Sequence, residues 1–210
     1  MLLDRAGNRM HTGRYWDTDA KKHTSGDGPG GRAYSAFPID WDADGDFDLV
    51  VGTDKGGIFL RINEGTKTKP AFAVKVVAIR SGQMKASVSR YAMPIAADWD
   101  GDSRWDLISG SKDGAVYWFR NVGKTGKPLF EPRRTLVASS RRDGRGPQNS
   151  AQVDVADFDG DGDMDLLVGD QAAETSNGKR ERHGWIWLYR RSKARVVQVP
   201  PGVRQRGERR

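Results

Sequence analysis

Three short apolar runs that end in glycine stand out along the chain, and each directly follows an acidic stretch. The runs are Leu49–Gly52, Leu107–Gly110 and Leu166–Gly169. Apolar runs of this length, bounded by turn residues, are typical of buried β-strands. A further apolar run follows each of them, at Ile58–Ile62, Val116–Phe119 and Trp185–Tyr189. The pattern therefore predicts antiparallel strands joined by turns.

The acidic stretches recur at a nearly constant period. Asp98 lies 58 residues after Asp40, and Asp157 lies 59 residues after Asp98. The first period also holds a strand-like run before the acidic stretch, Ala33–Ile39, and a candidate fourth strand, Phe72–Ile79. Four strands in a repeat of this length describe one blade of a β-propeller. We predict an all-β protein: a partial β-propeller of about three four-stranded blades and the end of a fourth.

The period also predicts the domain boundaries. We expect blade 1 at residues 33–90, blade 2 at residues 91–150 and blade 3 at residues 151–199. Residues 1–32 would be the remnant of a preceding blade and a flexible loop. The third copy contains a polar insertion at residues 171–183, for which we expect a long, mobile hairpin tip. Its last strand is expected at Val196–Val199, and residues 200–210 are predicted to be a basic, disordered tail.

Each acidic stretch places aspartates on alternate residues. The first reads D-W-D-A-D-G-D-F-D from Asp40 to Asp48, and the later copies begin at Asp98 and Asp157. So many like charges repel one another unless a hard cation lies among them, and Ca²⁺ takes roughly six to eight oxygen ligands. An EF-hand would need a glutamate at its twelfth position, where this chain has Val51, Ser109 and Val168. We therefore predict about three Ca²⁺ sites in loops that close at the ninth residue.

Composition narrows the class of protein. The chain has 210 residues, a net charge of +7 and no cysteine, so disulfides do not stabilise it. Residues 190–210 contain eight Lys and Arg but one acid, Glu208, so the excess charge belongs to this segment. A nucleic-acid contact of this tail is the weaker alternative to a solvated one. No run reaches the roughly 20 apolar residues of a membrane-spanning helix, and Met1–Arg5 lacks the apolar region of a signal peptide.

The order of motifs within each copy is specific. The loop D-x-D-x-D-G-x-x-D runs into D-L and an apolar strand ending in glycine, and then into N-x-G at Asn63–Gly65 and Asn121–Gly123. In this order the chain resembles the FG-GAP/VCBS repeat family, the integrin α-like β-propeller repeats, over residues 33–191. It departs from the family pattern at Ser103, where glycine is usual, and at the insertion in the third copy.

Candidate metal ligands follow from the alternation and from the resemblance. In the first loop we assign the side chains of Asp40, Asp42, Asp44 and Asp48 and the backbone carbonyl of Asp46. The resemblance implies the same roles for Asp98, Asp100, Asp102 and Asp106 with the Arg104 carbonyl, and for Asp157, Asp159, Asp161 and Asp165 with the Asp163 carbonyl. Gly45 and Gly162 permit a tight turn that Ser103 makes under strain, so the second site is predicted to be the weakest.

Other residues suggest packing rather than chemistry. Trp41, Trp99 and Phe158 share one loop position and are expected to cover the packing beside the ion. The histidines, His11, His23 and His183, lie in predicted loops without matched partners. No nucleophile or phosphate-loop motif occurs, so we expect no enzymatic activity and no cofactor besides Ca²⁺.

The resemblance implies a calcium-binding scaffold for adhesion or for binding protein or carbohydrate, located outside the cell or at its surface. The alternative is an accessory or partial domain of a secreted carbohydrate-active enzyme similar to polysaccharide lyases. A nucleic-acid partner is not expected. Family propellers close with about seven blades. We therefore expect either that the chain is a fragment of a longer propeller or that it closes by self-association.

Overall fold

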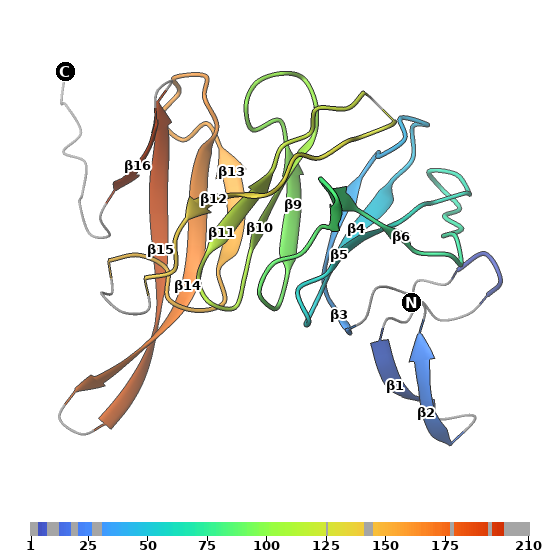
Figure 1. Ribbon diagram of the computed structural model, residues 1–210, viewed down its shortest axis with the longest axis horizontal. Coiled ribbons are helices and arrows are strands. Elements are labelled where there is room, and N and C mark those ends of the chain that lie inside the picture. Colours follow the sequence, from blue (N-terminus) through green and yellow to red (C-terminus); the bar gives the residue numbers. More distant parts are fainter. Residues whose placement is uncertain are drawn as a thin grey trace.

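Three four-stranded antiparallel sheets stand side by side as a fan (Figure 1). The computed structural model describes residues 4–7, 13–17, 21–26, 31–124, 126–140, 145–176, 179–192 and 195–199. Every regular element in these ranges is a strand, and accordingly none of them is a helix long and apolar enough to cross a membrane. The prediction of an all-β, partial propeller is confirmed.

The first sheet contains the predicted strands in sequence order. They are β3 (Ala33–Ile39), β4 (Asp48–Thr53), β5 (Ile58–Arg61) and β6 (Val77–Ala78). The fourth strand is much shorter than the predicted Phe72–Ile79. The reason is Arg61, whose guanidinium donates to the carbonyls of Ala73 (3.0 Å) and Val74 (2.9 Å). A side chain therefore satisfies backbone acceptors that a longer ladder would have used.

The second and third sheets repeat this order. The second contains β9 (Met93–Ala97), β10 (Asp106–Gly110), β11 (Val116–Phe119) and β12 (Arg134–Val137). The third contains β13 (Gln152–Ala156), β14 (Asp165–Ser176), β15 (Lys179–Ser192) and β16 (Arg195–Val199). Two small pairs complete the chain: β1 (Gly13–Asp17) with β2 (Lys22–Gly26), and β7 (Arg80–Ser81) with β8 (Met84–Lys85).

The polar insertion of the third copy lengthens the hairpin of β14 and β15. Their antiparallel ladder continues from the Gln171–Gly184 pair to the Ser176–Lys179 pair (Figure 1). The insertion therefore extends the sheet instead of forming a separate loop. The predicted tail at residues 200–210 lies outside the described residues, as do His11 and much of the predicted remnant at residues 1–32.

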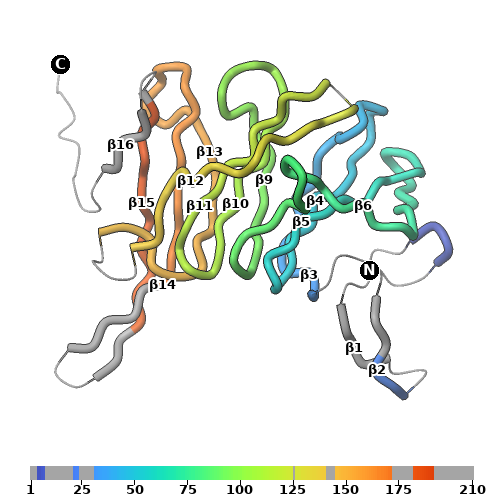
Figure 2. Tube along the Cα trace, viewed as in Figure 1, coloured from blue at the N-terminus to red at the C-terminus, as the bar shows by residue number. Residues whose placement is uncertain are grey.

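Apolar side chains fill the two spaces between neighbouring sheets. One cluster joins the first sheet to the second through residues such as Val50, Ile58 and Leu107. The other joins the second sheet to the third through residues such as Ile108 and Leu166. The chain passes through the sheets in order (Figure 2), so each space is closed by consecutive copies of the repeat. Each copy thus contributes one side of a shared core, as expected of a propeller.

The pairing registers define which residues are equivalent among the copies. Gly52 pairs with Ile58, Gly110 with Val116, and Gly169 with Ile186. Two residues earlier, Val50, Ile108 and Leu167 are likewise equivalent. On the following strand, Arg61, Phe119 and Tyr189 are equivalent because they pair with Leu49, Leu107 and Leu166. The residues directly after them, Ile62, Arg120 and Arg190, are therefore equivalent too. These equivalences allow each copy to serve as a control for the others.

Candidate metal centres

Each acidic stretch is the loop between the first two strands of a sheet, so the three loops hold the same place in the repeat. The loops join β3 to β4, β9 to β10, and β13 to β14. In each loop the first three alternate aspartates converge, and one carboxylate oxygen from each lies within 4.8 Å of the others. The three sets are Asp40, Asp42 and Asp44; Asp98, Asp100 and Asp102; and Asp157, Asp159 and Asp161.

The first aspartate of each loop is fixed by backbone amides. Asp40 accepts the amides of Asp44 (3.1 Å) and Gly45 (3.2 Å) on its two carboxylate oxygens. Asp98 likewise accepts the amides of Asp102 and Ser103, both at 2.9 Å. Asp157 accepts those of Asp161 and Gly162, both at 3.1 Å. The loop backbone therefore curls around this carboxylate and turns the third and fifth side chains towards it.

Two residues in each loop adopt a positive φ. At the sixth position these are Gly45 (94°), Ser103 (65°) and Gly162 (86°), as predicted from the glycine pattern. At the fourth position they are Ala43 (62°), Gly101 (75°) and Gly160 (77°), and the alanine in the first loop hides this requirement in the sequence pattern. The first and second loops therefore each carry one strained residue that is not glycine, whereas the third carries none.

The ninth aspartate of each loop is buried and bound to backbone. Asp48 accepts the amides of Trp41 (3.0 Å) and Asn63 (2.6 Å). Asp106 accepts the amide of Asn121 (2.6 Å), and Asp165 accepts those of Phe158 (3.1 Å) and Arg191 (2.8 Å). These carboxylates lie outside the converging sets and tie the loop to the third strand of the sheet. Their role as ligands remains a prediction.

Burial raises the pKa of two of these carboxyls. It is the main cause for Asp48, where the amide of Asn63 opposes it. For Asp106 burial raises the pKa to about 6, again against the amide of Asn121. A nearby cation would favour the charged form that burial disfavours.

Several buried carboxylate oxygens have no hydrogen-bond partner among the described residues. They are Asp46 Oδ1 in the first loop, Asp100 Oδ1 and Asp106 Oδ2 in the second, and Asp163 Oδ2 in the third. A buried oxygen without a partner is costly, and oxygen donors are the ligands that Ca²⁺ prefers. Of these oxygens Asp100 Oδ1 belongs to a converging set, and each set offers the carboxylate donors that a hard divalent cation takes. We assign the converging aspartates as the residues that would hold it.

Arginines neutralise the second loop. The guanidinium of Arg120 lies 2.5 Å from Asp100 Oδ2 and 3.6 Å from Asp102 Oδ2. Arg104 is also paired with Asp102, and its Nε donates to the Asn121 carbonyl at 2.9 Å. Two cationic side chains therefore already occupy part of the space in which an ion would be attracted.

The other loops differ in this respect. In the third, Arg190 lies 3.4 Å from Asp159 and Arg191 lies 3.0 Å from Asp163. In the first, the residue equivalent to Arg120 and Arg190 is Ile62, and no ion pair of the described residues includes an aspartate of that loop. Local charge therefore favours cation binding in the order first, third and second loop.

The loop aromatics differ between copies. Trp99 is 2% exposed, Trp41 packs against the first core, and Phe158 is 61% exposed. The prediction that all three cover packing is therefore wrong for Phe158. No further sheet of the described chain follows the third copy, so most of this ring stays exposed.

A comparison with protein families agrees with this geometry. Residues 98–168 match the sequence model of the FG-GAP-like repeat. This part of the chain is therefore similar to the FG-GAP-like repeat. The match runs from the second aspartate loop to the strand after the third, and so covers one full period of the repeat in this chain and the loop that follows it. No curated protein matches the chain in sequence.

Proposed function

We propose that this protein is a calcium-stabilised, propeller-type scaffold that binds a protein or carbohydrate partner. The observation that carries the proposal is the convergence of three aspartates at the same place in each of three loops. Each loop joins the first two strands of a sheet, so a bound ion would hold that hairpin together. The proposed role of the ion is structural, and the proposal includes no catalytic step.

We further propose that the scaffold works outside the cell or at its surface. Calcium loops of extracellular modules bind at about 10⁻⁴–10⁻³ M, a range that matches Ca²⁺ levels there. At 100 times the dissociation constant, one site would add about 2.7 kcal/mol to the free energy of unfolding. That is a large share of the roughly 5–15 kcal/mol of an ordinary domain.

Calorimetry and thermal melts test the calcium sites directly. The protein is titrated with CaCl₂ after EDTA treatment, and melts are compared in EDTA and in millimolar Ca²⁺. We expect a higher melting temperature in Ca²⁺, and loss of one site when Asp42→Ala removes a central ligand of the first loop. Glu64→Gln, outside the loops, is the matched control. Equal melting temperatures with and without Ca²⁺ would overturn the proposal.

A second observation favours an anionic carbohydrate as the partner. The rings of Tyr34 and Tyr91 lie 4.7 Å apart, and Tyr34 is 50% exposed. Lys112 Nζ lies 4.8 Å and the Arg90 guanidinium 5.3 Å from the centre of the Tyr91 ring. Aromatic faces stack on sugar rings, and adjacent cations attract acidic substituents.

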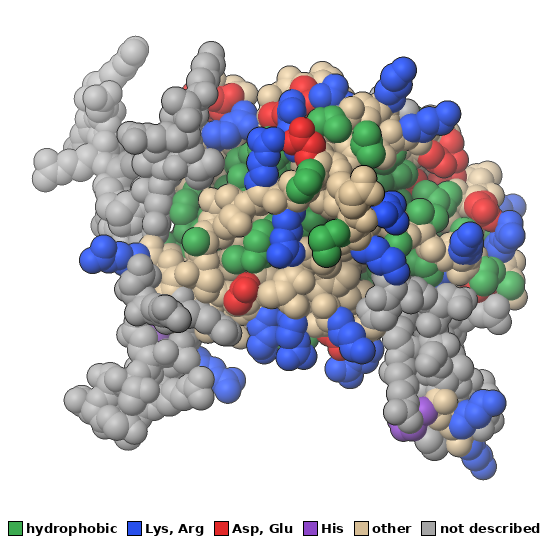
Figure 3. All heavy atoms as spheres, in the orientation of Figure 1, with side chains coloured by type: hydrophobic (Ala, Val, Ile, Leu, Met, Phe, Trp, Pro, Cys, Tyr) green, Lys and Arg blue, Asp and Glu red, His purple; other side chains and the backbone are tan. Residues whose placement is uncertain are grey.

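Binding to immobilised polygalacturonate and to neutral dextran distinguishes this ligand class. We expect retention on polygalacturonate that weakens in Lys112→Gln and in Arg90→Gln, with no retention on dextran. Lys85→Gln, which changes charge away from the two rings, controls for net charge. On the face drawn in Figure 3, Lys and Arg side chains are dispersed over the described surface.

A further inference from the structure

The outer face of the third sheet has the composition of a contact surface. We call it the trailing face and define it by Leu167, Gly169 and Ile186. The residues equivalent to Ile186 are Ile58 and Val116, which are 1% and 0% exposed, whereas Ile186 is 73% exposed. Val50 and Ile108, equivalent to Leu167, are both completely buried. In the first two copies the next sheet covers these positions.

Gly169 shows that the same close approach is possible on the trailing face. A Cβ on Gly52 would lie 2.1 Å from the carbonyl oxygen of Ala92, and one on Gly110 would lie 1.9 Å from that of Ala151. Both glycines therefore let the first strand of the following sheet approach. A Cβ on Gly169 would meet nothing within 4 Å. Within the described part of the chain, the third copy thus has the glycine without a sheet packed on it.

The first sheet presents the complementary surface. We call it the leading edge and define it by Ala36 and Pro38 on β3. Both are exposed, whereas their equivalents in β9, Pro94 and Ala96, are buried against the first sheet. Val153, equivalent to Ala36 in the third copy, is 9% exposed and belongs to the second core. Among the described residues there is therefore one uncovered surface of each kind.

We propose that the leading edge of one copy of this protein packs on the trailing face of a second copy. Ala36 of one copy would pack on Gly169 of the other, as Pro94 packs on Gly52 within the chain. The first sheet of the copy that contributes Ala36 would then cover Ile186, as the second sheet covers Ile58. Two copies joined at both edges would form a closed ring of three sheets from each. The occupant is a second copy because β3, from Ser35 onwards, pairs with its sheet in the register of β9 and β13, the strands that cover Gly52 and Gly110, with one extra residue, Tyr34, before it.

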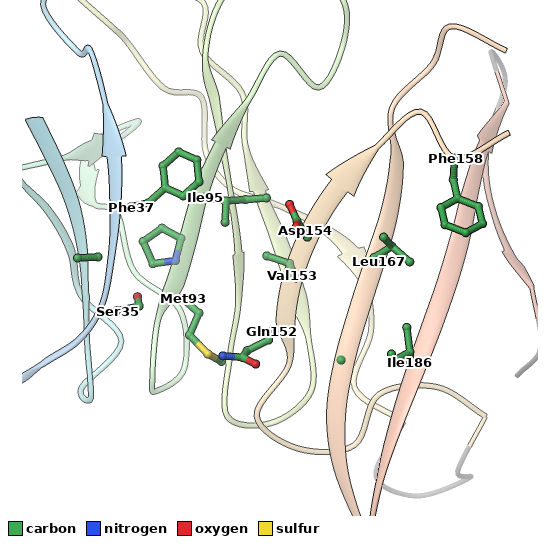
Figure 4. Close-up of a pocket in the computed structure, with 13 residues that line it drawn as sticks. Ser35, Phe37, Met93, Ile95, Gln152, Val153, Asp154, Phe158, Leu167 and Ile186 are labelled. Atoms are coloured by element: carbon green, nitrogen blue, oxygen red, sulfur yellow. The ribbon is translucent and has the colours of Figure 1, made fainter. Parts of the chain in front are cut away.

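The hollow on the concave side of the fan fits this arrangement. It has a volume of about 710 Å³, and residues of both surfaces line it, including Ala36, Gly169 and Ile186. Figure 4 shows Phe37 and Ile95 facing Leu167, Phe158 and Ile186 across it. A second copy would close this hollow into a central channel.

The contact is expected to be reversible. Beside the trailing face, β13 of the third sheet carries the polar residues Gln152 and Asp154. The equivalent residues are Ser35 and Phe37 in the first sheet and Met93 and Ile95 in the second. On the side of the first sheet that carries the leading edge, Val51 of β4 and Phe59 of β5 are already buried. The contact with a second copy would therefore be made by β3. A small contact with an apolar centre and a polar margin is typical of reversible association.

Light scattering after size exclusion tests the proposal with the full chain, in Ca²⁺ and over a range of protein concentrations. We expect a mass that rises from 23.3 kDa towards twice that value with concentration. Ile186→Arg on the trailing face and Ala36→Arg on the leading edge should each weaken association at least about tenfold. Met84→Arg is the control, because Met84 is 75% exposed and belongs to neither surface.

Mixing the two variants distinguishes this contact from a symmetric one. Each variant keeps one intact surface, so an equimolar mixture should form a heterodimer that neither forms alone. A monomer at all concentrations would overturn the proposal, as would an Ala36→Arg protein that still forms dimers. Circular dichroism of each variant shows whether it is folded. The outcome does not depend on whether the loops bind calcium.

Discussion

The Arg120 guanidinium lies 2.5 Å from a carboxylate oxygen of Asp100, in the middle of the second aspartate loop. In the first copy the equivalent residue is Ile62, so this repeat offers its own comparison. We predict that Arg120→Ile raises the Ca²⁺ affinity of the second loop by about three- to tenfold, because a competing positive charge is removed. The effect is moderate because both side chains are partly exposed to solvent.

Calorimetric titration of Arg120→Ile measures this change. The control is Arg134→Ile, which removes an arginine whose ion pair with Glu131 lies outside the loops. An unchanged second-site affinity in Arg120→Ile would contradict the view that arginine and calcium compete for Asp100 and Asp102.

The glycines at the end of the second strands give a matched pair. We predict that Gly110→Ala lowers the free energy of unfolding by about 1–3 kcal/mol, because the new methyl group collides with the Ala151 carbonyl. Gly169→Ala should change it by less than about 0.5 kcal/mol, because that methyl group meets nothing within 4 Å. Urea unfolding at low protein concentration measures both, and equal losses would show that the two glycines serve the same local purpose.

The strained loop residues allow a gain in stability. Ser103 and Ala43 hold φ values of 65° and 62°, which cost an ordinary residue about 1 kcal/mol. We predict that Ser103→Gly and Ala43→Gly each raise the free energy of unfolding by about 0.5–1 kcal/mol. The control is Ala33→Gly in a strand, where glycine should destabilise slightly. A loss of stability in both loop variants would be inconsistent with backbone strain.

The pH dependence of stability involves Asp113 in the turn between β10 and β11. Burial alone would raise its pKa, but hydrogen bonds from the Ser111 hydroxyl and, at 3.3 Å, from the Ala115 amide lower it below 3.8. A carboxyl whose pKa is lower in the folded state stabilises the protein above its unfolded pKa. That stability is lost as the pH falls through the folded-state pKa.

We therefore predict that Asp113→Asn lowers the free energy of unfolding by about 1 kcal/mol at pH 7. The difference from the wild type should shrink as the pH is lowered from 4 towards 2. Urea unfolding in Ca²⁺-free buffer over this range measures it. A difference that stays constant with pH would mean that the charge of Asp113 contributes nothing.

The sequence predicts the sheets and the converging aspartates well because both depend on short-range order. Alternating aspartates followed by an apolar run ending in glycine place three carboxylates in one loop, and the structure brings Asp40, Asp42 and Asp44 together as expected. The arginines were missed because Arg120 lies 20 residues after Asp100. Only the pairing of β10 with β11 brings them together. Aligning Ile62, Arg120 and Arg190 would have revealed the difference.

Two other features depended on information that a single repeat does not contain. The short β6 results from Arg61 binding the carbonyls of Ala73 and Val74, a choice between side chain and ladder that apolar patterning cannot reveal. The exposure of Phe158 depends on whether another sheet follows. Its place in the loop is the same as that of Trp99, which is buried by the third copy.

The glycine beside each interface also explains how such a protein can change in length. Gly52 and Gly110 belong to the copy that receives a neighbour, while the carbonyl that approaches belongs to the copy that follows, and Gly169 holds the same place in the third copy. Each duplication of the repeat therefore supplies both the glycine and the approaching carbonyl of a new contact between sheets. Adding or removing a whole copy would therefore keep each glycine together with the carbonyl that meets it. Natural variation in the number of sheets would then be easier to reach than variation in the spacing within one.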